Sequence, residues 1–588
     1  MMVQKSHRHG VVTLEHGSFV ASETVLVCAA RCTNSSGALV TRRPEILARS
    51  VAPGCVYGYD VEVQVGIQRF VHHRQREEIR QDLKDLYGIS LSTGEVSTLE
   101  ARFIQHFECL HRRRAPAIRD ALARDGGYPL HIDATGEDGR GTLFIAYAGW
   151  RGWVLGSWKI STERADLILP HLCDVSASFG APCALLRDLG RAVIDAALEF
   201  VKGLRRGIPI IGCHQHFLSD VGNDLMEPSH DELRNLFRRS KIRPRLRTFA
   251  RDLARLIGPK ISALRVNLST WLEEATDYRL PEGQAGLATV RALAQWALDY
   301  ASEGDDLGFP YDRPYLDLYK RCRTVSRATD AFRRRPIKDR TVRRYLKRLA
   351  KILDPVITDT SFSRIAKTLS TRVNLFEELR VVLRLNPKPP GEQEPNQNRA
   401  AAELRDIQKA IKSLARSLRR RRPQRGPAQD SREAIDLVLD HLDRHGDSLW
   451  GHVIHLPARV GGGTRVVART NNLVEGLFHQ MKHGERRRSG RKVLTRDFEV
   501  LPAGAALACN LSHPDYVKLL CGSLEKLPAA FAALGQSLPR DRTTSTEPET
   551  LSASFTQADR RIVRAERLRR IIEEAARSRA PRFYSATA

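Results

Sequence analysis

Three acidic residues stand where carboxylates can converge on a metal ion. Asp133 ends the first strand of a predicted sheet, and Asp188 ends the fourth. Glu475 lies on a late predicted helix. Converging carboxylates repel one another unless a cation neutralises them, and Mg²⁺ binds carboxylate oxygens. The three residues are therefore candidate metal ligands, whereas any one of them alone is more simply a surface or capping residue.

The predicted helix that carries Glu475 has two different faces. Its polar face is formed by residues three or four positions apart: Asn472, Glu475, His479 and Lys482. Its apolar face is formed by Val474, Leu477, Phe478 and Met481. If the apolar face packs on the sheet, Glu475 points toward the two aspartates. The basic residues Lys482, Arg486, Arg487 and Arg488 continue from the polar face toward the end of this helix.

The aspartates are held by a predicted sheet. Residues 128–213 read as strands and helices in the order β-β-β-α-β-α-β. The strands are predicted at 128–133, 141–148, 153–160, 182–188 and 208–213, and the helices at 163–179 and 192–201. Strands first, followed by alternating helices and strands, indicate a mixed sheet with helices on its faces. We therefore expect an α/β core whose first part covers 126–227 and whose second part, with the glutamate helix, covers 451–535.

A helix-turn-helix DNA-binding domain is predicted at 61–125. Alternating valines favour a strand over 61–71, followed by a helix over 75–87 and a turn at 88–91. Ser92 and Glu95 have the spacing of a capping box at the start of a second helix. The residues that this second helix would expose to DNA are Thr93, Ser97, Glu100 and Arg102. An ordinary helical hairpin is the alternative.

Two groups of residues offer zinc ligands. In the N-terminal region, 1–60, a zinc ribbon would need four ligands. Cys28, Cys32 and Cys55 supply three, and the fourth would have to be the distant His7 or His9, so any such ribbon is degenerate. At the end of the last predicted strand, Cys213 and His216, with His214 between them, offer two or three ligands and no visible fourth. A packing role in the core is the simpler interpretation of this second group. Zinc is left open at both.

A helical unit interrupts the predicted sheet domain. Residues 228–450 show helical periodicity, are rich in Arg and Lys, and contain no paired-carboxylate or metal-ligand spacing. Candidate phosphate contacts are Arg243, Arg245, Arg247 and Arg419–Arg422, with a solvated helix surface as the alternative. We expect the insertion to contribute DNA contacts or subunit assembly, and a passive helical lid that only supports the sheet is the alternative. Residues 536–588 are predicted to be a linker and a basic C-terminal helix.

The overall charge favours a polyanionic partner. The 588 residues include 95 Lys and Arg against 68 Asp and Glu, a net charge of +27. Such an excess attracts DNA through counterion release, and arginine suits phosphate; a generally arginine-rich composition is the alternative. No apolar run is long enough to span a membrane and no signal peptide is visible, so we expect a cytoplasmic, nucleoid-associated protein. Ten dispersed cysteines argue against a disulfide network.

The order of these motifs resembles that of the DDE transposases of insertion sequences. The shared features are Asp133 on the first strand, Asp188 after the fourth and Glu475 on a late helix that follows a long helical insertion. The string from Cys213 to His216 is similar to the C-x2-H signature of Mutator-like and hAT-like transposases. The resemblance covers about 61–525. It implies an RNase H-like mixed-sheet core, interrupted by a large all-helical insertion and preceded by a helix-turn-helix module.

The resemblance also implies a chemistry. The protein would be a DNA transposase that cleaves DNA and joins strands, with Asp133, Asp188 and Glu475 as catalytic ligands of two Mg²⁺ ions, which Mn²⁺ could replace. Cys213, His216 and His479 would be auxiliary residues. Lys482, Arg486, Arg487 and Arg488 would contact DNA phosphates and position the DNA strand without reading its sequence. The partners would be element ends and target DNA, bound by a homodimer or higher oligomer. The alternatives are a nuclease on the same core that never joins strands, and a non-catalytic DNA-binding protein derived from a transposase.

Overall fold

The computed structural model describes the chain except for residues 1, 35–36, 38, 43–44, 53, 138–139, 205, 258–279, 281, 302–306, 386–396 and 536–588. The chain divides into two compact units. The first comprises 1–213 and the returning segment 451–588, and the second is 214–450. The predicted basic helix near the C-terminus lies outside the described residues. Every described helix is too short or too polar to cross a bilayer.

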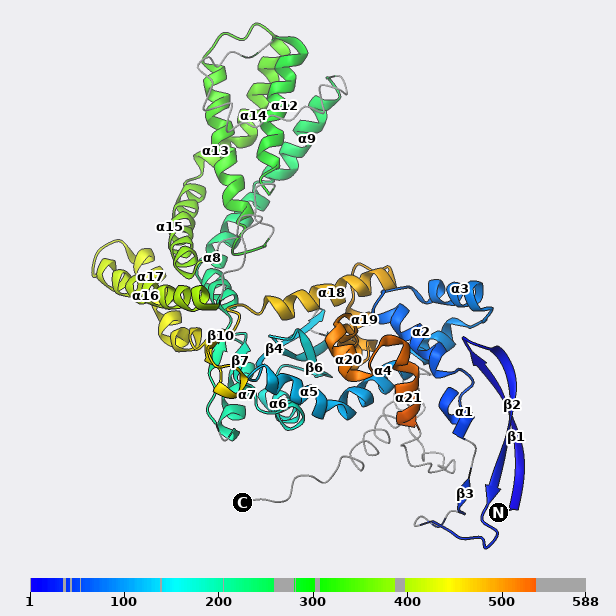
Figure 1. Cartoon of the computed structure of the whole chain (residues 1–588). Helices are drawn as coiled ribbons and strands as arrows, with labels where there is room; N and C mark the ends of the chain where they lie inside the picture. The colour runs from blue at the N-terminus through cyan, green and yellow to red at the C-terminus, as the bar shows by residue number, and fades with distance from the viewer. Residues whose placement is uncertain are drawn as a thin grey trace. The chain divides into compact units, whose positions relative to one another are not determined.

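The first unit is built on a mixed sheet of five strands (Figure 1). The strands are β4 (Pro129–Glu137), β5 (Arg140–Ala148), β6 (Trp153–Lys159), β7 (Ala184–Arg187) and β8 (Ile210–Gly212). They lie in the order β6-β5-β4-β7-β8. β5 is antiparallel to both β4 and β6, whereas β7 is parallel to both β4 and β8. The predicted mixed sheet is confirmed, together with the order in which its strands and helices follow one another.

Two helices connect the strands that run in the same direction. α6 (Ala165–Phe179) joins β6 to β7, and α7 (Arg191–Gly203) joins β7 to β8. Parallel strands need such crossovers because each strand must start again from the same end of the sheet. Ile168, Leu172 and Val175 of α6 are buried in the same core as the apolar side chains of the sheet. The first strand, β4, thus becomes the centre of the sheet, and its first five residues are all buried.

The N-terminal region forms a long hairpin. β1 (Met2–Thr13) pairs antiparallel with β2 (Gly17–Val27), the end of β2 pairs with β3 (Thr41–Arg42), and α1 (Glu45–Ser50) follows. The thiols of Cys28 and Cys32 are in hydrogen-bonding contact, whereas Cys55 lies near Glu62 and Arg102. Within the described part of the chain these cysteines form no group of three metal ligands. The geometry therefore gives no support to a zinc ribbon.

Residues 61–70 are helical, so the strand predicted there is wrong. They belong to α2 (Tyr59–Phe70). The alternating valines are all buried because α2 packs on two sides. Val61 and Val65 join a core formed with the two following helices, whereas Val63 joins the core of the sheet domain. A helix that is buried on two faces does not show apolar residues only at every third or fourth position. Its apolar residues can then alternate along the sequence, as they do in a half-buried strand.

The two helices of the predicted DNA-reading module are present. They are α3 (Arg76–Tyr87) and α4 (Thr93–Arg113), and Ser92 and Glu95 form the predicted capping box. α4 is 21 residues long and is followed by α5 (Ala115–Arg124). Phe103 and Phe107 of α4 are buried in the core of the sheet domain. The helix pair is thus joined to that core, and its reading of DNA stays a prediction.

Two of the four residues predicted to face DNA are engaged inside the protein. Glu100 is buried and forms ion pairs with Arg69 and Arg76, so its predicted exposure is wrong. Arg102 forms an ion pair with the fully buried Glu62, with 2.7 Å between Nη2 and Oε2, and only 14% of its side chain is exposed. A carboxylate in the core is stable only with a charged or hydrogen-bonding partner. Arg102 therefore turns toward Glu62, although its position in the helix periodicity predicts exposure to solvent. Thr93 is exposed and Ser97 is partly exposed.

Replacing Arg102 with alanine is expected to lower the free energy of unfolding by about 3 kcal/mol, because the buried Glu62 carboxylate would lose its guanidinium partner. Denaturant unfolding of the full chain, followed by circular dichroism, measures the change. Ser97→Ala on the same helix is the control and should unfold like the parent. An Arg102→Ala protein of parental stability but reduced affinity for duplex DNA would contradict this structural role.

The second unit consists of helices in its described part. They are α8 (His214–Arg239), α9 (Ile242–Ala254), α12 (Gly283–Leu298), α13 (Pro314–Arg333), α14 (Arg340–Thr358), α15 (Thr360–Leu383), α16 (Gln397–Arg421), α17 (Gln429–His445) and the short 3₁₀ helix Gly446–Leu449. The unit begins before the predicted residue 228, because α8 follows β8 after a single residue. Its two ends meet, since His214 Nε2 donates a hydrogen bond to the backbone oxygen of Leu449 at 2.8 Å.

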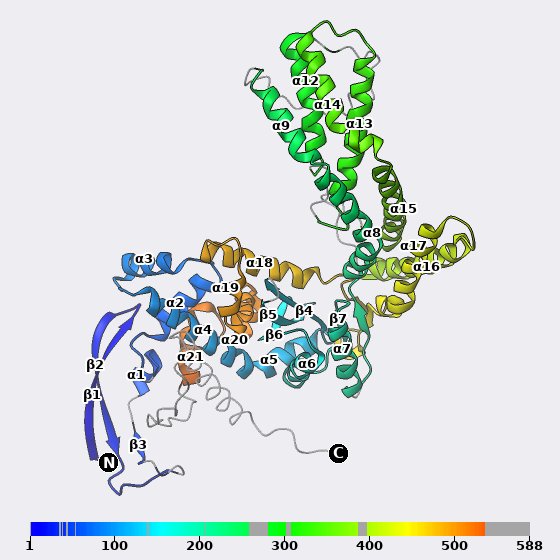
Figure 2. The same ribbon diagram turned by 180° about the vertical axis from the view of Figure 1, so that it is seen from behind.

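The chain then returns to the first unit. A hairpin of β9 (Val453–His455) and β10 (Thr464–Val466) precedes α18 (Asn472–Ser489). α19 (Thr495–Val500), α20 (Pro514–Leu520) and α21 (Leu527–Gly535) follow. As predicted, α18 is two-faced, and its apolar residues are buried in the core of the sheet domain: Val474, Leu477, Phe478 and Met481. Figure 2 shows α18 running beside the sheet.

Candidate active site

Asp133 lies on β4, and Asp188 directly follows the end of the adjacent parallel strand β7. The pairing of β4 with β7 places Leu130 opposite Leu185 and His131 opposite Leu186, an offset of 55 residues (185 − 130). The same offset separates Asp133 from Asp188, two residues beyond the last pair. In parallel strands, residues at the same register position point to the same face of the sheet. The register therefore places both carboxylates at the level where β7 ends. Asp133 does not end its own strand as predicted, because β4 stays paired with β5 as far as Glu137.

Cys213 extends this row by one strand. β7 pairs with β8 at an offset of 25 residues, which places Arg187 opposite Gly212 and, one step further, Asp188 opposite Cys213. The backbone N–H of Cys213 donates to the Arg187 oxygen at 2.8 Å, which continues the ladder to this point. β7 and β8 thus end just before Asp188 and Cys213, at the register level of Asp133, whereas β4 continues beyond Asp133 to Glu137.

Asn471 binds the start of α18 to this row. It is fully buried, and its side-chain N–H₂ donates to the Asp133 Oδ2 atom at 3.0 Å and to the Ile132 backbone oxygen at 3.2 Å. Its backbone N–H lies 3.3 Å from Cys213 Sγ. Burial lowers the pKa of His131 to about 4, so this imidazole is neutral, and its Nδ1–H can donate to Asn471 Oδ1 at 3.2 Å. Sequence reasoning missed Asn471, whose signal was its place immediately before the glutamate helix.

Glu475 follows one helical turn after Asn471. Its backbone N–H donates to the Asn471 oxygen at 3.0 Å, the first regular bond of the helix. A Glu475 carboxylate oxygen and the Cys213 Sγ atom lie within 4.8 Å of each other. The helix start that holds Asp133 therefore also brings Glu475 to the end of the sheet.

One group in the described part of the chain has the spacing of metal ligands. Cys213, Glu475 and His216, which lies in the first turn of α8, each offer one ligand atom, and these atoms lie within 4.8 Å of one another. A thiol and an imidazole suit Zn²⁺ better than Mg²⁺. Asp133, Asp188 and Glu475 do not form such a group. Ligands of two ions about 4 Å apart can themselves lie up to about 8 Å apart, so a shared two-ion site does not require them to.

A fourth carboxyl group lies close to Asp188. Burial, together with the negative charge of Asp188, raises the pKa of Glu163. Asp188 itself accepts a hydrogen bond at Oδ1 from the backbone N–H of Gly190 at 3.2 Å, and the buried Arg187 guanidinium donates to its backbone oxygen at 2.6 Å. Sequence reasoning missed Glu163 because a carboxylate at a helix start is commonly a capping residue.

The basic residues of α18 divide into two kinds. His479, Arg486 and Arg487 are exposed, and the His479 ring stacks on that of His483 with centroids 6.5 Å apart. Arg488 is instead buried against Glu485, and it donates to the Arg69 backbone oxygen at 3.1 Å. Lys482 is part-buried and donates to the Gly136 oxygen at 3.1 Å. Arg488 is thus not an exposed phosphate contact as predicted, because it neutralises a buried glutamate.

No family model matches the chain, and no curated protein matches it significantly. What the site does must therefore be argued from the residues of this chain.

Asn471→Ala is expected to lower the free energy of unfolding by about 1–3 kcal/mol, because the buried Asp133 carboxylate and the His131 ring would each lose a hydrogen-bond partner. Denaturant unfolding of the full chain measures it. The neighbouring Asn472→Ala removes the same group from an exposed position and should have little effect. Equal stability of the two variants would show that the Asn471 contacts do not hold α18 on the sheet.

Proposed function

We propose that this chain catalyses metal-dependent phosphoryl transfer on DNA, as a transposase of the DDE type with an RNase H-like core. One observation carries the proposal: the register of the parallel strands β4 and β7, continued by two residues, brings Asp188 level with Asp133, and the helix that bears Glu475 starts from a hydrogen bond to Asp133. The confirmed order of strands and helices, on which the RNase H-like expectation rests, supports the same interpretation.

The donor set fits hard divalent cations. The register of β4 and β7 brings Asp188 level with Asp133, and the pKa of Glu163 is raised by burial and by the negative charge of Asp188. Carboxylates that share a site are costly unless a cation neutralises them, and oxygen ligands suit Mg²⁺ or Mn²⁺. Asp133, Asp188 and Glu475 would hold the ions. When bound, the ions would activate water or a 3′-hydroxyl and stabilise the leaving oxygen of the phosphodiester.

Residues of the chain itself would supply orientation and charge. Asn471 holds the Asp133 carboxylate through Oδ2, and the Ala134 backbone N–H donates to Oδ1 at 2.8 Å, so the carboxylate is fixed before any ion arrives. The exposed Arg486 and Arg487 lie on the same helix as Glu475 and would contact the phosphates of a bound strand. The net charge of +27 would attract DNA as a whole.

The test uses purified full-length protein and a duplex that carries the DNA flanking its gene. Nicking or cleavage is expected with Mg²⁺ or Mn²⁺ and not with EDTA. Asp133→Asn, Asp188→Asn and Glu475→Gln should each lower the cleavage rate by about 100-fold or more while duplex binding persists. Asp195→Asn on α7, an exposed acid of the same domain, is the matched control and should cleave normally.

The products decide which reaction the chain performs. Joining of a pre-cut 3′ end to a second duplex would support a transposase. Cleavage without any joined product would indicate a nuclease instead. If the protein binds duplex DNA but does not cleave it with any metal ion tested, the catalytic proposal is wrong and the chain is a non-catalytic DNA-binding protein.

A further inference from the structure

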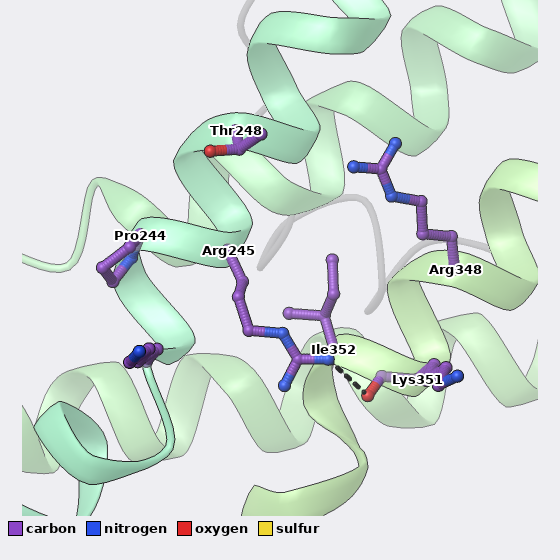
Figure 3. A pocket seen from close by; sticks show the side chains of 7 residues that line it. Pro244, Arg245, Thr248, Arg348, Lys351 and Ile352 are labelled. Atoms are coloured by element: carbon purple, nitrogen blue, oxygen red, sulfur yellow. Dashed lines mark hydrogen bonds between the residues drawn. The ribbon is translucent and has the colours of Figure 1, made fainter.

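A pocket of about 400 Å³ in the helical unit is lined mainly by cations. It lies between α9 and α14, and its lining residues are Lys241, Pro244, Arg245, Thr248, Arg348, Lys351 and Ile352. Figure 3 shows Arg245 of α9 reaching toward α14, where it donates to the Lys351 backbone oxygen at 3.4 Å. Thr248 adds a hydroxyl donor. The pocket therefore presents cationic and neutral donors to whatever enters it.

Most of this positive charge is not neutralised by the protein. Arg348 pairs with Asp252, with 2.7 Å between Nη2 and Oδ2, and its guanidinium lies over the Phe249 ring. Within the described residues, Lys241, Arg245 and Lys351 form no ion pair. Four cations thus meet one carboxylate at the pocket, an arrangement that is stable only where water or an anion compensates the charge.

The charge continues along α14. Its six basic residues are all exposed: Arg340, Arg343, Arg344, Lys347, Arg348 and Lys351. Asp354 is its only acidic residue. Six cations over 11 helical steps span about 16 Å, or one per roughly 3.3 Å, and a DNA strand carries one phosphate per about 3.4 Å of helix axis. The stripe therefore has the linear charge density of a nucleic acid strand.

The opposite face of α14 is already occupied. Val342, Leu346, Leu349, Leu353 and Val356 are buried. An amphipathic helix that binds a membrane needs its apolar face free to enter the lipid, so this helix is not suited to a bilayer. Arginine forks favour phosphate oxygens, and a linear array favours a linear polyanion.

We propose that α9 and α14 form a binding face for the backbone of duplex DNA, with one phosphate seated in the pocket between Arg245 and Lys351. The choice of DNA as the polyanion rests on the proposed function. The existence of an anion-binding site rests on the positive charges of the pocket and of α14. Contacts of this kind are independent of base sequence, so the face would hold DNA without selecting it.

The test measures the affinity of the full chain for a 30-base-pair duplex of arbitrary sequence (about three turns) in EDTA, over a series of salt concentrations. The double variant Arg245→Glu/Lys351→Glu should bind at least about tenfold more weakly near 0.1 M salt, and the slope of log affinity against log salt should shrink by about 0.9 per lost contact. The neutral pair Arg245→Gln/Lys351→Gln should lose less affinity in the same direction. Circular dichroism confirms that each variant is folded.

The matched control is Lys409→Glu/Lys412→Glu, which makes the same change of charge at exposed positions of α16. If the pocket variants and this control bind equally, with equal salt slopes, the proposal is overturned. Vesicles that contain anionic phosphatidylserine provide a second comparison. If the parental chain binds them as tightly as DNA, through the same two residues, the proposal is overturned and the face is a membrane-binding surface. Normal cleavage with unchanged binding would refute this face alone, whereas charge-dependent binding without any cleavage would refute only the proposed catalysis.

Discussion

The hydrogen bonds of one buried amide hold the candidate active site together. Asn471 touches Asp133 and Ile132 on β4 and lies against the Cys213 thiol after β8, although 338 residues separate it from Asp133 in the chain. Each contact satisfies a polar group that would otherwise be stranded in the core. The position of α18, and therefore of Glu475, follows from these few bonds together with the apolar face that the helix buries on the sheet domain.

The positive charge of the chain serves two different ends. Some arginines neutralise carboxylates within the fold: Arg102 does so for Glu62, and Arg422 for Asp436. Arg419 and Arg421 are likewise paired, with Asp443 and Glu378. The run Arg419–Arg422 that looked like a phosphate site is thus largely committed to its own unit. The charge available to a partner lies instead on α9 and α14, where acids are scarce.

Sequence patterns predicted what local chemistry determines. The order of strands and helices, the capping box at Ser92 and the two faces of α18 all follow from periodicity and hydrogen bonding within a few residues. The same patterns failed where a second packing surface was present. The strand predicted around Val63 is wrong because the burial of α2 on two sides cannot be read from one segment. Asn471 and Glu163 gained their roles only from residues far away in the chain.

The hydrogen bond that joins the two ends of the helical unit affects how the two parts of the sheet domain can come together during folding. His214 and Leu449 are hydrogen bonded although 235 residues separate them in sequence. Once the helical unit has folded, its two ends are therefore held close together. The sequence separation between Asp133 and Asn471 is 338 residues, and the folded helical unit bridges 235 of them, so the loop that must still close has an effective length of about 100 residues. The entropy saved is only about 1 kcal/mol, since closure cost grows with the logarithm of length. During synthesis, however, the strands that bear the aspartates leave the ribosome long before the glutamate helix, and an early closing of the helical unit would bring the two halves of the sheet domain within reach of each other.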